Sequence, residues 1–513
     1  MDGDTCHLIV MVGLPARGKS FIASRLSRYL KWIGYDAKIF NAGTYRRKMS
    51  CFQGDFQSHE FFNPENKESV KKRMEFVEAA FKDMQNFLDE KPRRVGVFDA
   101  TNTTRARREW VLEKVKTFKY DCKVFFIESI CDDPETIEKT VEEVKLNGKD
   151  YNLLKKNIEC ENRSRAESKD SCSIASSVNE ACELQVKLEE KINKEAAQRA
   201  AAANSDFMKR IKQYQKVYEP LDEKEDGHLS FIKIINIGQR HIVNHVNTYV
   251  QSRIVYFLMN VTIGHNREIY ITRHGESQYN QSGKIGGDSN LSENGWNYAE
   301  QLGKHINNIV LVDENDSNKK SPNFEIWTSE LKRTQQTASF IKQEFSTWKC
   351  LNEINAGVCE ELTYEEISSI YPNVEKERDE DKYNYRYPMG ESYHDLVQRL
   401  EPVIMELERR DKTIVVCHQA VMRCILAYFL DESYQQLPYM KIPLHTLHKL
   451  TPKAYGCELE KLKFDIEAVD THKDRSDSEA NTLNLNLTSE ENNNSSNSVD
   501  EKYKMSVPTI QIN

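Results

Sequence analysis

The N-terminal part of the chain contains a run of residues with the spacing of a phosphate-binding loop. Residues 13–20 read GLPARGKS, which matches the pattern GxxxxGK[ST]. The glycines let backbone N–H groups wrap around phosphate oxygens, and the start of a following helix favours their negative charge. In such loops the lysine bridges the β- and γ-phosphates of a nucleotide and the hydroxyl binds Mg²⁺. A chance glycine turn is the alternative, but the apolar run before the loop and the helical pattern after it favour a nucleotide site made of Gly13, Leu14, Pro15, Ala16, Arg17, Gly18, Lys19 and Ser20.

A carboxylate suited to phosphoryl transfer follows the apolar run 94–98. Asp99 would lie at the carboxyl end of a strand, where open α/β sheets bind ligands. It could bind Mg²⁺, directly or through water, or accept the proton of an acceptor hydroxyl. A helix N-cap is the alternative role, but Thr103 or Thr104 is a better cap for the next helical segment.

Arginines gather near these expected strand ends and predict an anionic acceptor. The guanidinium group fits phosphate through two parallel hydrogen bonds, so several converging arginines favour a phosphorylated substrate. Singly, each arginine is more often a solvated surface residue. The cluster consists of Arg46, Arg47, Arg73, Arg105, Arg107 and Arg108.

A second set of residues combines histidines with arginines and could transfer a phosphoryl group. The apolar run 268–272 ends in Arg273-His274-Gly275-Glu276, and the run 413–417 ends in His418. Histidine can attack phosphorus at neutral pH, and arginines can neutralise the phosphoryl oxygens. A carboxylic acid near the bridging oxygen can protonate the leaving alcohol. A structural histidine or a zinc site is the alternative, but the adjoining arginines would repel a metal cation.

These residues need two α/β units to position them. In the first half, strand-like runs at 8–12, 37–40, 94–98 and 123–127 alternate with helical segments at 21–33, 67–88, 104–116 and 134–145. A second alternating unit starts near residue 267, with strands at 268–272, 324–327 and 413–417. The alternation predicts parallel sheets covered by helices, in two different domains.

Composition fits an intracellular globular protein of more than one domain. The chain has 513 residues and a net charge of -8, so no strongly basic face indicates nucleic acid as a partner. The 12 cysteines include no CxxC pair and favour reduced thiols in the cytoplasm. We expect no signal peptide and no membrane span. Residues 155–203 look like an insertion and 473–513 like a disordered tail.

The two sites together resemble one family, the bifunctional 6-phosphofructo-2-kinase/fructose-2,6-bisphosphatases. The resemblance covers about residues 6–151 and 204–472, through stretches that include GLPARGKS, VFDATNTTR, FFIESICDDP, RHGES, WTSELKRT, LNEINAGVCEELTYEEI, DKYNYRYPMGESY and CHQAVMRC. It implies a P-loop kinase domain over 1–265 and a histidine phosphatase domain, similar to phosphoglycerate mutase, over 266–472. It also implies ATP with Mg²⁺ in the kinase half, no cofactor in the phosphatase half, and a homodimer.

For the kinase half, the resemblance implies transfer of the γ-phosphate of ATP to the 2-hydroxyl of fructose 6-phosphate. Lys19 and Asp99 would be central to transfer, Ser20 and Asp99 would serve the metal, and Cys131 matches a cysteine near the site. Lys145 would touch the nucleotide, and the sugar phosphate would bind Arg47, Arg73, Thr101, Arg107, Arg210 and Tyr214. Ser20 replaces the usual Thr, Thr140 stands where Asn is usual, and Thr44 replaces an acidic or amide residue.

For the phosphatase half, the resemblance implies hydrolysis of fructose 2,6-bisphosphate through a phosphohistidine on His274. Glu353 would be the proton donor, and Arg273, Asn280, Arg333 and His418 would hold the phosphoryl group. The rest of the substrate would bind Gly286, Tyr364, Arg378, Lys382, Arg386, Tyr393, Gln419 and Arg423.

The alternatives to a balanced bifunctional enzyme are a kinase-dominant enzyme with weak phosphatase, a catalytically dead scaffold, and a nucleotide kinase fused to a general phosphatase. Because Lys19, Asp99, His274 and Arg333 are all present, we expect both activities, which would set the level of a regulator of glycolysis and gluconeogenesis.

Overall fold

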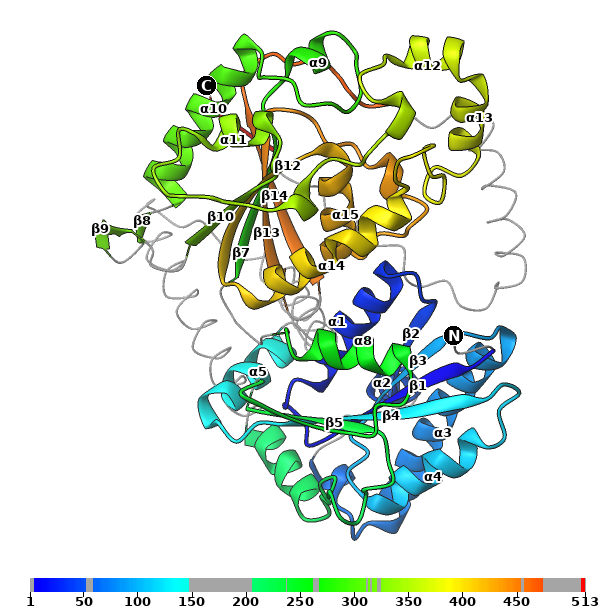
Figure 1. The fold of residues 1–513 in the computed structure, drawn as a ribbon. Helices are drawn as coiled ribbons and strands as arrows, with labels where there is room; N and C mark the ends of the chain where they lie inside the picture. The colour runs from blue at the N-terminus through cyan, green and yellow to red at the C-terminus, as the bar shows by residue number, and fades with distance from the viewer. Residues whose placement is uncertain are drawn as a thin grey trace, which may run out of the picture. The chain divides into compact units, whose positions relative to one another are not determined.

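The computed structural model describes ten stretches of the chain in two compact units. The first unit comprises Met1–Ser27 and Tyr35–Met259, and the second comprises Arg28–Gly34 and Asn260–Asn513. Figure 1 labels the helices and strands of both units. The described residues are 4–51, 59–146, 205–236, 238–261, 267–310, 312–313, 316–320, 324–453, 456–473 and 509–512.

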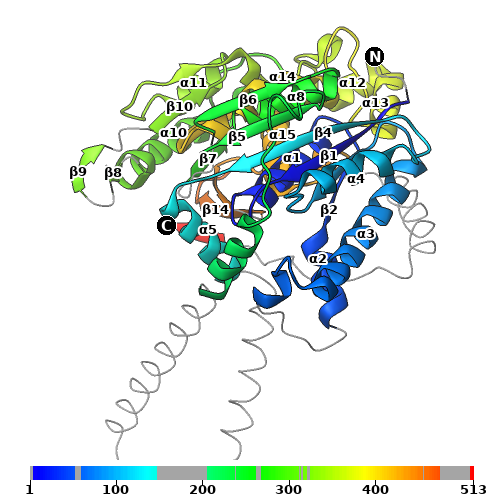
Figure 2. The ribbon, with the colours of Figure 1, turned by 90° about the horizontal axis from the view of Figure 1, so that it is seen from below.

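A six-stranded sheet forms the centre of the first unit, in the order β2-β3-β1-β4-β5-β6. All strand pairs are parallel except β5 with β6. Every residue of β1, CHLIVMV, is buried, as expected for a parallel strand covered on both faces. Figure 2 shows β6, β5, β4 and β1 side by side. The strands are β1 Cys6–Val12, β2 Ala37–Asn41, β3 Val95–Asp99, β4 Cys122–Ile130, β5 Phe231–Ile235 and β6 Arg240–Asn244.

Helices cover both faces of this sheet. α1 and α8 lie on one side, and α3 and α4 on the other (Figure 1). Thr104 caps α4 by accepting a hydrogen bond from the Arg107 backbone N–H, which leaves Asp99 without a capping role for this helix. The helices are α1 Lys19–Trp32, α2 Ala42–Cys51, η1 His59–Phe62, α3 Lys67–Glu90, α4 Arg105–Val115, α5 Pro134–Leu146 and α8 Tyr249–Leu258, and residues 205–215 are also helical.

The second unit is built on a seven-stranded mixed sheet, in the order β11-β10-β12-β7-β13-β14-β15. β10, β12 and β7 are parallel, and β13 runs antiparallel to both β7 and β14. The strands are β7 Glu268–Arg273, β10 Phe324–Thr328, β11 Ser346–Thr347, β12 Lys412–Cys417, β13 Thr446–Lys453, β14 Gly456–Phe464 and β15 Thr509–Ile512. A separate hairpin joins β8 Val312–Asp313 to β9 Asp316–Lys320.

Several helices position the active-site loops of the second unit. α15 starts directly after β12, and its almost fully buried sequence QAVMRCILAYFL packs inside the unit. The helices are α9 Gln278–Gln281, α10 Glu293–His305, η2 Ile306–Val310, α11 Lys332–Ala338, η3 Lys349–Leu351, η4 Gly357–Cys359, α12 Tyr364–Ile370, α13 Pro372–Glu380, α14 Tyr393–Arg409, α15 Gln419–Leu430 and η5 Leu437–Tyr439.

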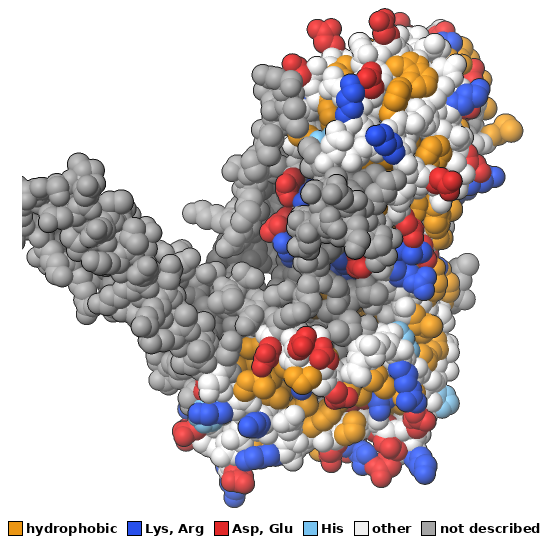
Figure 3. Space-filling view, turned by 90° about the vertical axis from the view of Figure 1, so that its left-hand side faces the viewer, with side chains coloured by type: hydrophobic (Ala, Val, Ile, Leu, Met, Phe, Trp, Pro, Cys, Tyr) orange, Lys and Arg blue, Asp and Glu red, His pale blue; other side chains and the backbone are white. Residues whose placement is uncertain are grey.

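The predicted fold class is confirmed, because both units are α/β with mostly parallel central strands. The insertion expected at 155–203 lies outside the described residues, as does most of the tail expected at 473–513. Among the described residues, no helix is long and apolar enough to cross a membrane. Acidic and basic side chains are intermixed on the face shown in Figure 3.

Candidate active sites

The predicted phosphate loop connects β1 to α1 in a conformation that depends on glycine. Gly13 has φ +131°, and a Cβ there would lie 2.6 Å from the Ser129 carbonyl oxygen. Its backbone N–H donates to the Thr101 carbonyl at 2.9 Å, which fixes the loop beside the end of β3. Lys19 is buried, and its ammonium group donates to the Leu14 carbonyl at 2.6 Å. The loop therefore folds around its own lysine at the N-terminus of a helix, as a phosphate cradle requires.

Asp99 lies buried at the end of β3 beside the loop. Its carboxylate accepts a hydrogen bond from the Asn41 side-chain amide and also interacts with the Ser20 hydroxyl. Burial raises the pKa of Asp99, while Ser20, Lys19 and Asn41 oppose the rise. Burial likewise lowers the pKa of Lys19 to about 8, and Asp99 opposes that fall. The buried carboxylate and the neighbouring hydroxyl are hard oxygen donors, a set that fits Mg²⁺.

Three of the residues predicted for the sugar phosphate contact Phe62, and a fourth, Arg107, interacts with two of them. The Arg210 guanidinium lies 3.8 Å from the centre of that ring, and the Tyr214 ring lies 5.9 Å from it. Arg73 donates to the Phe62 carbonyl at 3.1 Å. Arg107 is electrostatically coupled to Arg73 and Tyr214, and burial is the main cause that lowers its pKa. Sequence reasoning missed Phe62, because a lone aromatic residue carries no signal of such a role.

Three further residues predicted for the kinase half lie at separate positions. Arg47 lies on α2 and donates to the Thr44 hydroxyl at 3.1 Å. Cys131 is buried just after β4. Lys145 belongs to α5, but its side chain lies outside the described residues.

Two arginines of the predicted acceptor cluster have a different role. Arg105 pairs with Glu225, and the buried Arg108 donates to the Glu219 carbonyl at 2.8 Å and pairs with Asp226 at 3.5 Å. Both arginines therefore hold the chain between 219 and 226 against α4. Carboxylates and a carbonyl occupy the guanidinium groups of these two arginines, which belong to the cluster but not to the residues predicted for the sugar phosphate.

The segment 218–222, which reads YEPLD, forms hydrogen bonds with two parts of the kinase half. The Glu219 N–H donates to the Thr103 carbonyl at 2.8 Å, and its carboxylate accepts from the Arg105 N–H at 2.6 Å. On the other side, buried Glu128 accepts from the Tyr218 hydroxyl at 2.6 Å and from the Leu221 N–H at 3.1 Å. The segment thus connects β4 to the loop that follows Asp99.

In the second unit, the parallel pairing of β7 with β12 brings two histidines together. Arg273 pairs with Cys417 in register, so His274 and His418 both follow the strand ends, and their ring centres lie 5.2 Å apart. His274 Nδ1 lies 2.7 Å from the Gly275 carbonyl, to which it donates, and the lone pair is therefore on Nε2. Burial, then Arg333 and Arg273, lower the pKa of His274 well below its ordinary value. The imidazole is therefore neutral and nucleophilic at physiological pH.

Two glycines bring the His274 loop against the start of α10. A Cβ on Gly275 would lie 2.5 Å from the Gly295 carbonyl oxygen, and a Cβ on Gly295 would lie 2.0 Å from the Glu276 carbonyl oxygen. Both contacts are with backbone atoms, and the backbone cannot move aside as a flexible side chain would. The space between the two segments therefore requires glycine on both sides.

His418 is held by a hydroxyl, with one ring nitrogen left for another acceptor. Its Nε2 lies 2.8 Å from Ser329 Oγ, while its Nδ1 is buried and has no hydrogen-bond partner among the described residues. Burial and Arg333 lower the pKa of His418 well below its ordinary value. If Ser329 donates to Nε2, Nδ1 carries the hydrogen and can donate to a phosphoryl oxygen.

The predicted acid Glu353 occupies the N-terminus of α15. Its carboxylate oxygens accept hydrogen bonds from the backbone N–H groups of Gln419 and Ala420, both at 3.1 Å. The N-cap residue His418 makes no side-chain capping bond, so Glu353 satisfies two of the free N–H groups of this helix. The carboxylate is therefore fixed directly beside the histidine pair.

A pocket of about 380 Å³ opens at this site and is strongly basic. Burial, then Arg378 and Arg423, lower the pKa of Lys382 to about 7. Burial also lowers the pKa of Arg273 to about 10. Most predicted substrate residues line the pocket: Arg273, Asn280, Gly286, Arg333, Tyr364, Arg378, Lys382, Tyr393, Gln419 and Arg423. Arg386 does not line it within the described part of the chain, and its exposed guanidinium pairs with Asp395.

Sequence reasoning missed residues that support the His274 loop. The buried Glu276 carboxylate accepts from Ser292 Oγ at 2.7 Å and from the Val469 N–H at 2.9 Å. Its backbone N–H donates to His445 Nε2 at 3.0 Å. The position of Glu276 inside the RHGE motif was a usable signal. His445, 169 residues further along the chain, offered none.

The comparisons with known proteins agree with this division into two sites. The model of the 6-phosphofructo-2-kinase family matches residues 2–166 and 174–265, and that of the histidine phosphatase superfamily (branch 1) matches residues 269–465. Human 6-phosphofructo-2-kinase/fructose-2,6-bisphosphatase 1 is 47% identical over 468 residues, which are 91% of this chain and 86% of the relative. The chain belongs to the 6-phosphofructo-2-kinase/fructose-2,6-bisphosphatase family. The resemblance that the sequence motifs indicated is therefore confirmed.

Other members of the 6-phosphofructo-2-kinase/fructose-2,6-bisphosphatase family are similar to the same extent. Rat 6-phosphofructo-2-kinase/fructose-2,6-bisphosphatase 3 is 46% identical over 92% of this chain and 74% of its own length. The enzyme from Aquarana catesbeiana is 47% identical over 91% of this chain and 87% of its own length. Among solved structures, the alpha-ribazole phosphatase from Shigella flexneri is 18% identical and covers 40% of this chain and 96% of its own, with a TM-score of 0.32.

Proposed function

We propose that the chain catalyses two opposing reactions on one sugar phosphate. The first unit transfers the γ-phosphoryl group of ATP to the 2-hydroxyl of fructose 6-phosphate, and the second hydrolyses the 2-phosphate of the fructose 2,6-bisphosphate formed. The observation that carries the proposal is the neutral His274, with its Nε2 lone pair, in a basic pocket large enough for a sugar bisphosphate. The phosphate loop with Asp99 in the same chain supplies the opposing activity.

In the kinase unit, the chain's own residues position the two phosphate groups that react. Ser20 and Asp99 would hold Mg²⁺, which supplies positive charge to the transferring phosphates. Lys19 pairs with the β- and γ-phosphates once they replace the Leu14 carbonyl as its partner. Arg73, Arg107 and Arg210 bind the 6-phosphate. The 2-hydroxyl oxygen bonds to the γ-phosphorus, the bond between that phosphorus and the β-phosphate oxygen breaks, and ADP leaves. The Asp99 carboxylate accepts the hydroxyl proton.

In the phosphatase unit, the proposed reaction has two balanced steps. His274 Nε2 attacks phosphorus, the bond between phosphorus and the sugar oxygen breaks, and Glu353 gives its proton to that oxygen. Water then loses a proton to Glu353 and attacks the phosphohistidine, which releases phosphate and restores both residues. Arg273, Arg333 and His418 hold the phosphoryl oxygens during both steps.

The experiment separates this proposal from a kinase-dominant enzyme. The purified chain and its His274→Ala variant are each incubated with Mg-ATP and fructose 6-phosphate, and fructose 2,6-bisphosphate is followed over time. We expect both proteins to form the bisphosphate and the variant to accumulate clearly more. Coinciding curves would show a silent phosphatase, and absence of product in both would refute the kinase assignment.

We also infer that the chain forms a homodimer and works in the cytoplasm. β6 is an edge strand of the first sheet, and Val243 on it is 41% exposed; Tyr249 of α8, further along the chain, is also exposed. An open sheet edge can pair with the same edge of a second copy. The cysteines whose side chains are described, among them Cys6, Cys131 and Cys417, are free thiols, as in a reducing compartment. Light scattering of the purified chain tests the dimer: twice the mass of one chain supports it, and a monomer refutes it.

A further inference from the structure

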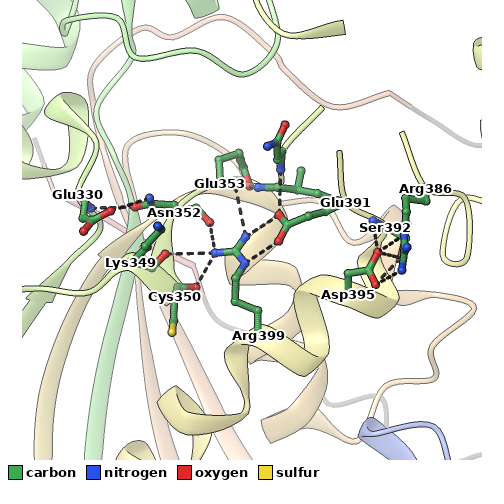
Figure 4. A network of polar contacts seen from close by, with 12 residues as sticks. Glu330, Lys349, Cys350, Asn352, Glu353, Arg386, Glu391, Ser392, Asp395 and Arg399 are labelled. Carbon is green, nitrogen blue, oxygen red and sulfur yellow. Dashed lines mark hydrogen bonds and ion pairs between the residues drawn. The ribbon is translucent and has the colours of Figure 1, made fainter. Parts of the chain in front are cut away.

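Arg399 on α14 donates hydrogen bonds to the backbone of the loop that carries Glu353. Its Nη1 donates to the carbonyls of Cys350 at 2.9 Å, Asn352 at 3.0 Å and Lys349 at 3.3 Å. Its Nη2 donates to the carbonyl of Glu353 itself at 3.3 Å. The Lys349 carbonyl also accepts from the Asn352 N–H at 3.0 Å, the bond that ends the 3₁₀ turn η3. One guanidinium thus donates hydrogen bonds to four backbone carbonyls within five consecutive residues (Figure 4).

Glu391 fixes the guanidinium in place. Its carboxylate accepts from Arg399 Nε and from Nη2, each at 2.9 Å, in the two-bond geometry that holds arginine in one plane. The same residue holds the far end of the loop, because its carboxylate accepts from the Asn355 N–H at 3.0 Å and its own N–H donates to the Asn355 carbonyl at 2.8 Å. The loop 349–355 is therefore held from both ends by one ion pair (Figure 4).

This ion pair does not belong to the substrate site. Arg399 and Glu391 are not among the described residues that line the pocket, whereas Glu353 is. Both partners are largely buried, with side-chain exposures of 22% and 25%. Every N–H of the guanidinium already has an acceptor within the protein, so Arg399 differs from the arginines that face the pocket and keeps no donor for a phosphate.

We propose that Arg399, locked by Glu391, is a positioning residue that sets the carboxylate of Glu353 at the oxygen of the leaving sugar. The inference rests on the proposed function, in which Glu353 protonates that oxygen. The Glu353 side chain is held by the N–H groups at the start of α15. The Glu353 backbone is held by Arg399. Without Arg399 the loop loses four hydrogen bonds, and the acid no longer stays aligned with the P–O bond that breaks. A misplacement of about 1 Å can lower a rate about 100-fold.

The test compares two substrates that differ in their need for an acid. Formation of the phosphohistidine is followed in a single turnover, with fructose 2,6-bisphosphate and with 4-nitrophenyl phosphate, whose leaving group departs without a proton. For Arg399→Gln we expect a fall of about 10- to 100-fold with the bisphosphate, little change in its KM, and a change within about twofold with 4-nitrophenyl phosphate. Arg409→Gln is the matched control on the same helix, because that arginine is half exposed and pairs only with Glu406 among the described residues; it should leave both rates unchanged.

Further variants separate positioning from charge and from support of the fold. Glu353→Gln should show the same selectivity, and adding Arg399→Gln to it should cause no further loss, since Arg399 acts through Glu353. Arg399→Lys keeps the charge but cannot reach four carbonyls, so we expect it to recover little activity. Equal losses with both substrates, wild-type rates in Arg399→Lys, or additive losses in the double variant would each overturn the proposal. If Glu353→Gln itself is not selective, the acid assignment fails, and this inference fails with it.

Discussion

At the scale of single residues, burial decides which form of each catalytic group is present. His274 and His418 are both buried near Arg333 and Arg273; burial and these two arginines lower the pKa of each imidazole, and both therefore remain neutral. A neutral His274 is a nucleophile, and a neutral His418 can still donate from the nitrogen that does not face Ser329. The same environment acts on Lys382, whose positive charge is less stable there than in water.

Lys382 gives the phosphatase a pH dependence above neutrality. Its pKa is lowered to about 7, so above that pH the free enzyme holds mostly the neutral amine, and an anionic phosphate must bind together with a proton. We expect kcat/KM for the bisphosphate to fall as the pH rises from 7 to 9, by at most about tenfold per unit. Steady-state rates across this range measure the effect. Lys382→Arg, which stays charged, should flatten the profile, and an equal slope in that variant would contradict the assignment.

At the scale of elements, strand ends were predictable, but contacts between distant segments were not. The run 94–98 was expected to deliver Asp99 at the edge of the sheet, and β3 Val95–Asp99 does so. Alternation of apolar runs and helical segments suffices for such a prediction, because the carboxyl ends of parallel strands share one edge. The contacts of Arg399 with the loop carbonyls span 46 to 50 residues, and no periodicity connects an arginine on one helix with carbonyls of a remote loop.

Segment 218–222 provides a test at this scale. The helical residues 205–215, which carry Arg210 and Tyr214, lead directly into it, and Glu128 holds it through Tyr218 and Leu221. Glu128→Leu keeps a similar volume but removes both acceptor oxygens, so the Tyr218 hydroxyl and the Leu221 N–H lose the group to which they donate. We expect KM for fructose 6-phosphate to rise about 5- to 10-fold and KM for ATP to change within about twofold, with a stability loss of about 1–3 kcal/mol. Initial rates and thermal unfolding measure the two effects, and equal increases in both KM values would refute this role.

At the scale of the whole molecule, each unit has a core of its own. Residues such as Val10, Phe81 and Phe126 form one in the first unit, and Tyr298, Ile326 and Val416 form one in the second. Each site is built from the strand ends of its own sheet. A substitution that removes one activity should therefore leave the structure that supports the other intact.

Two variants test this independence. We expect Lys19→Ala to abolish formation of the bisphosphate and to leave its hydrolysis within about twofold of wild type, since substitutions at independent sites act separately. Gly275→Ala should do the reverse, because its methyl group would displace the His274 loop. Both activities are measured on each purified variant. Loss of both from either substitution would show that the units do not act independently.

The mutual contact of Gly275 and Gly295 has a consequence for how this protein can evolve. Because each glycine faces the backbone of the other segment, a side chain at one position cannot be accommodated by any replacement at the other. In a library of selected variants, both positions should contain glycine alone whenever phosphatase activity is required. Methods that find contacts from correlated changes would therefore overlook this one, since neither position is free to change. If selection acted on the kinase alone, variation would be expected to appear here among the first places in the second unit.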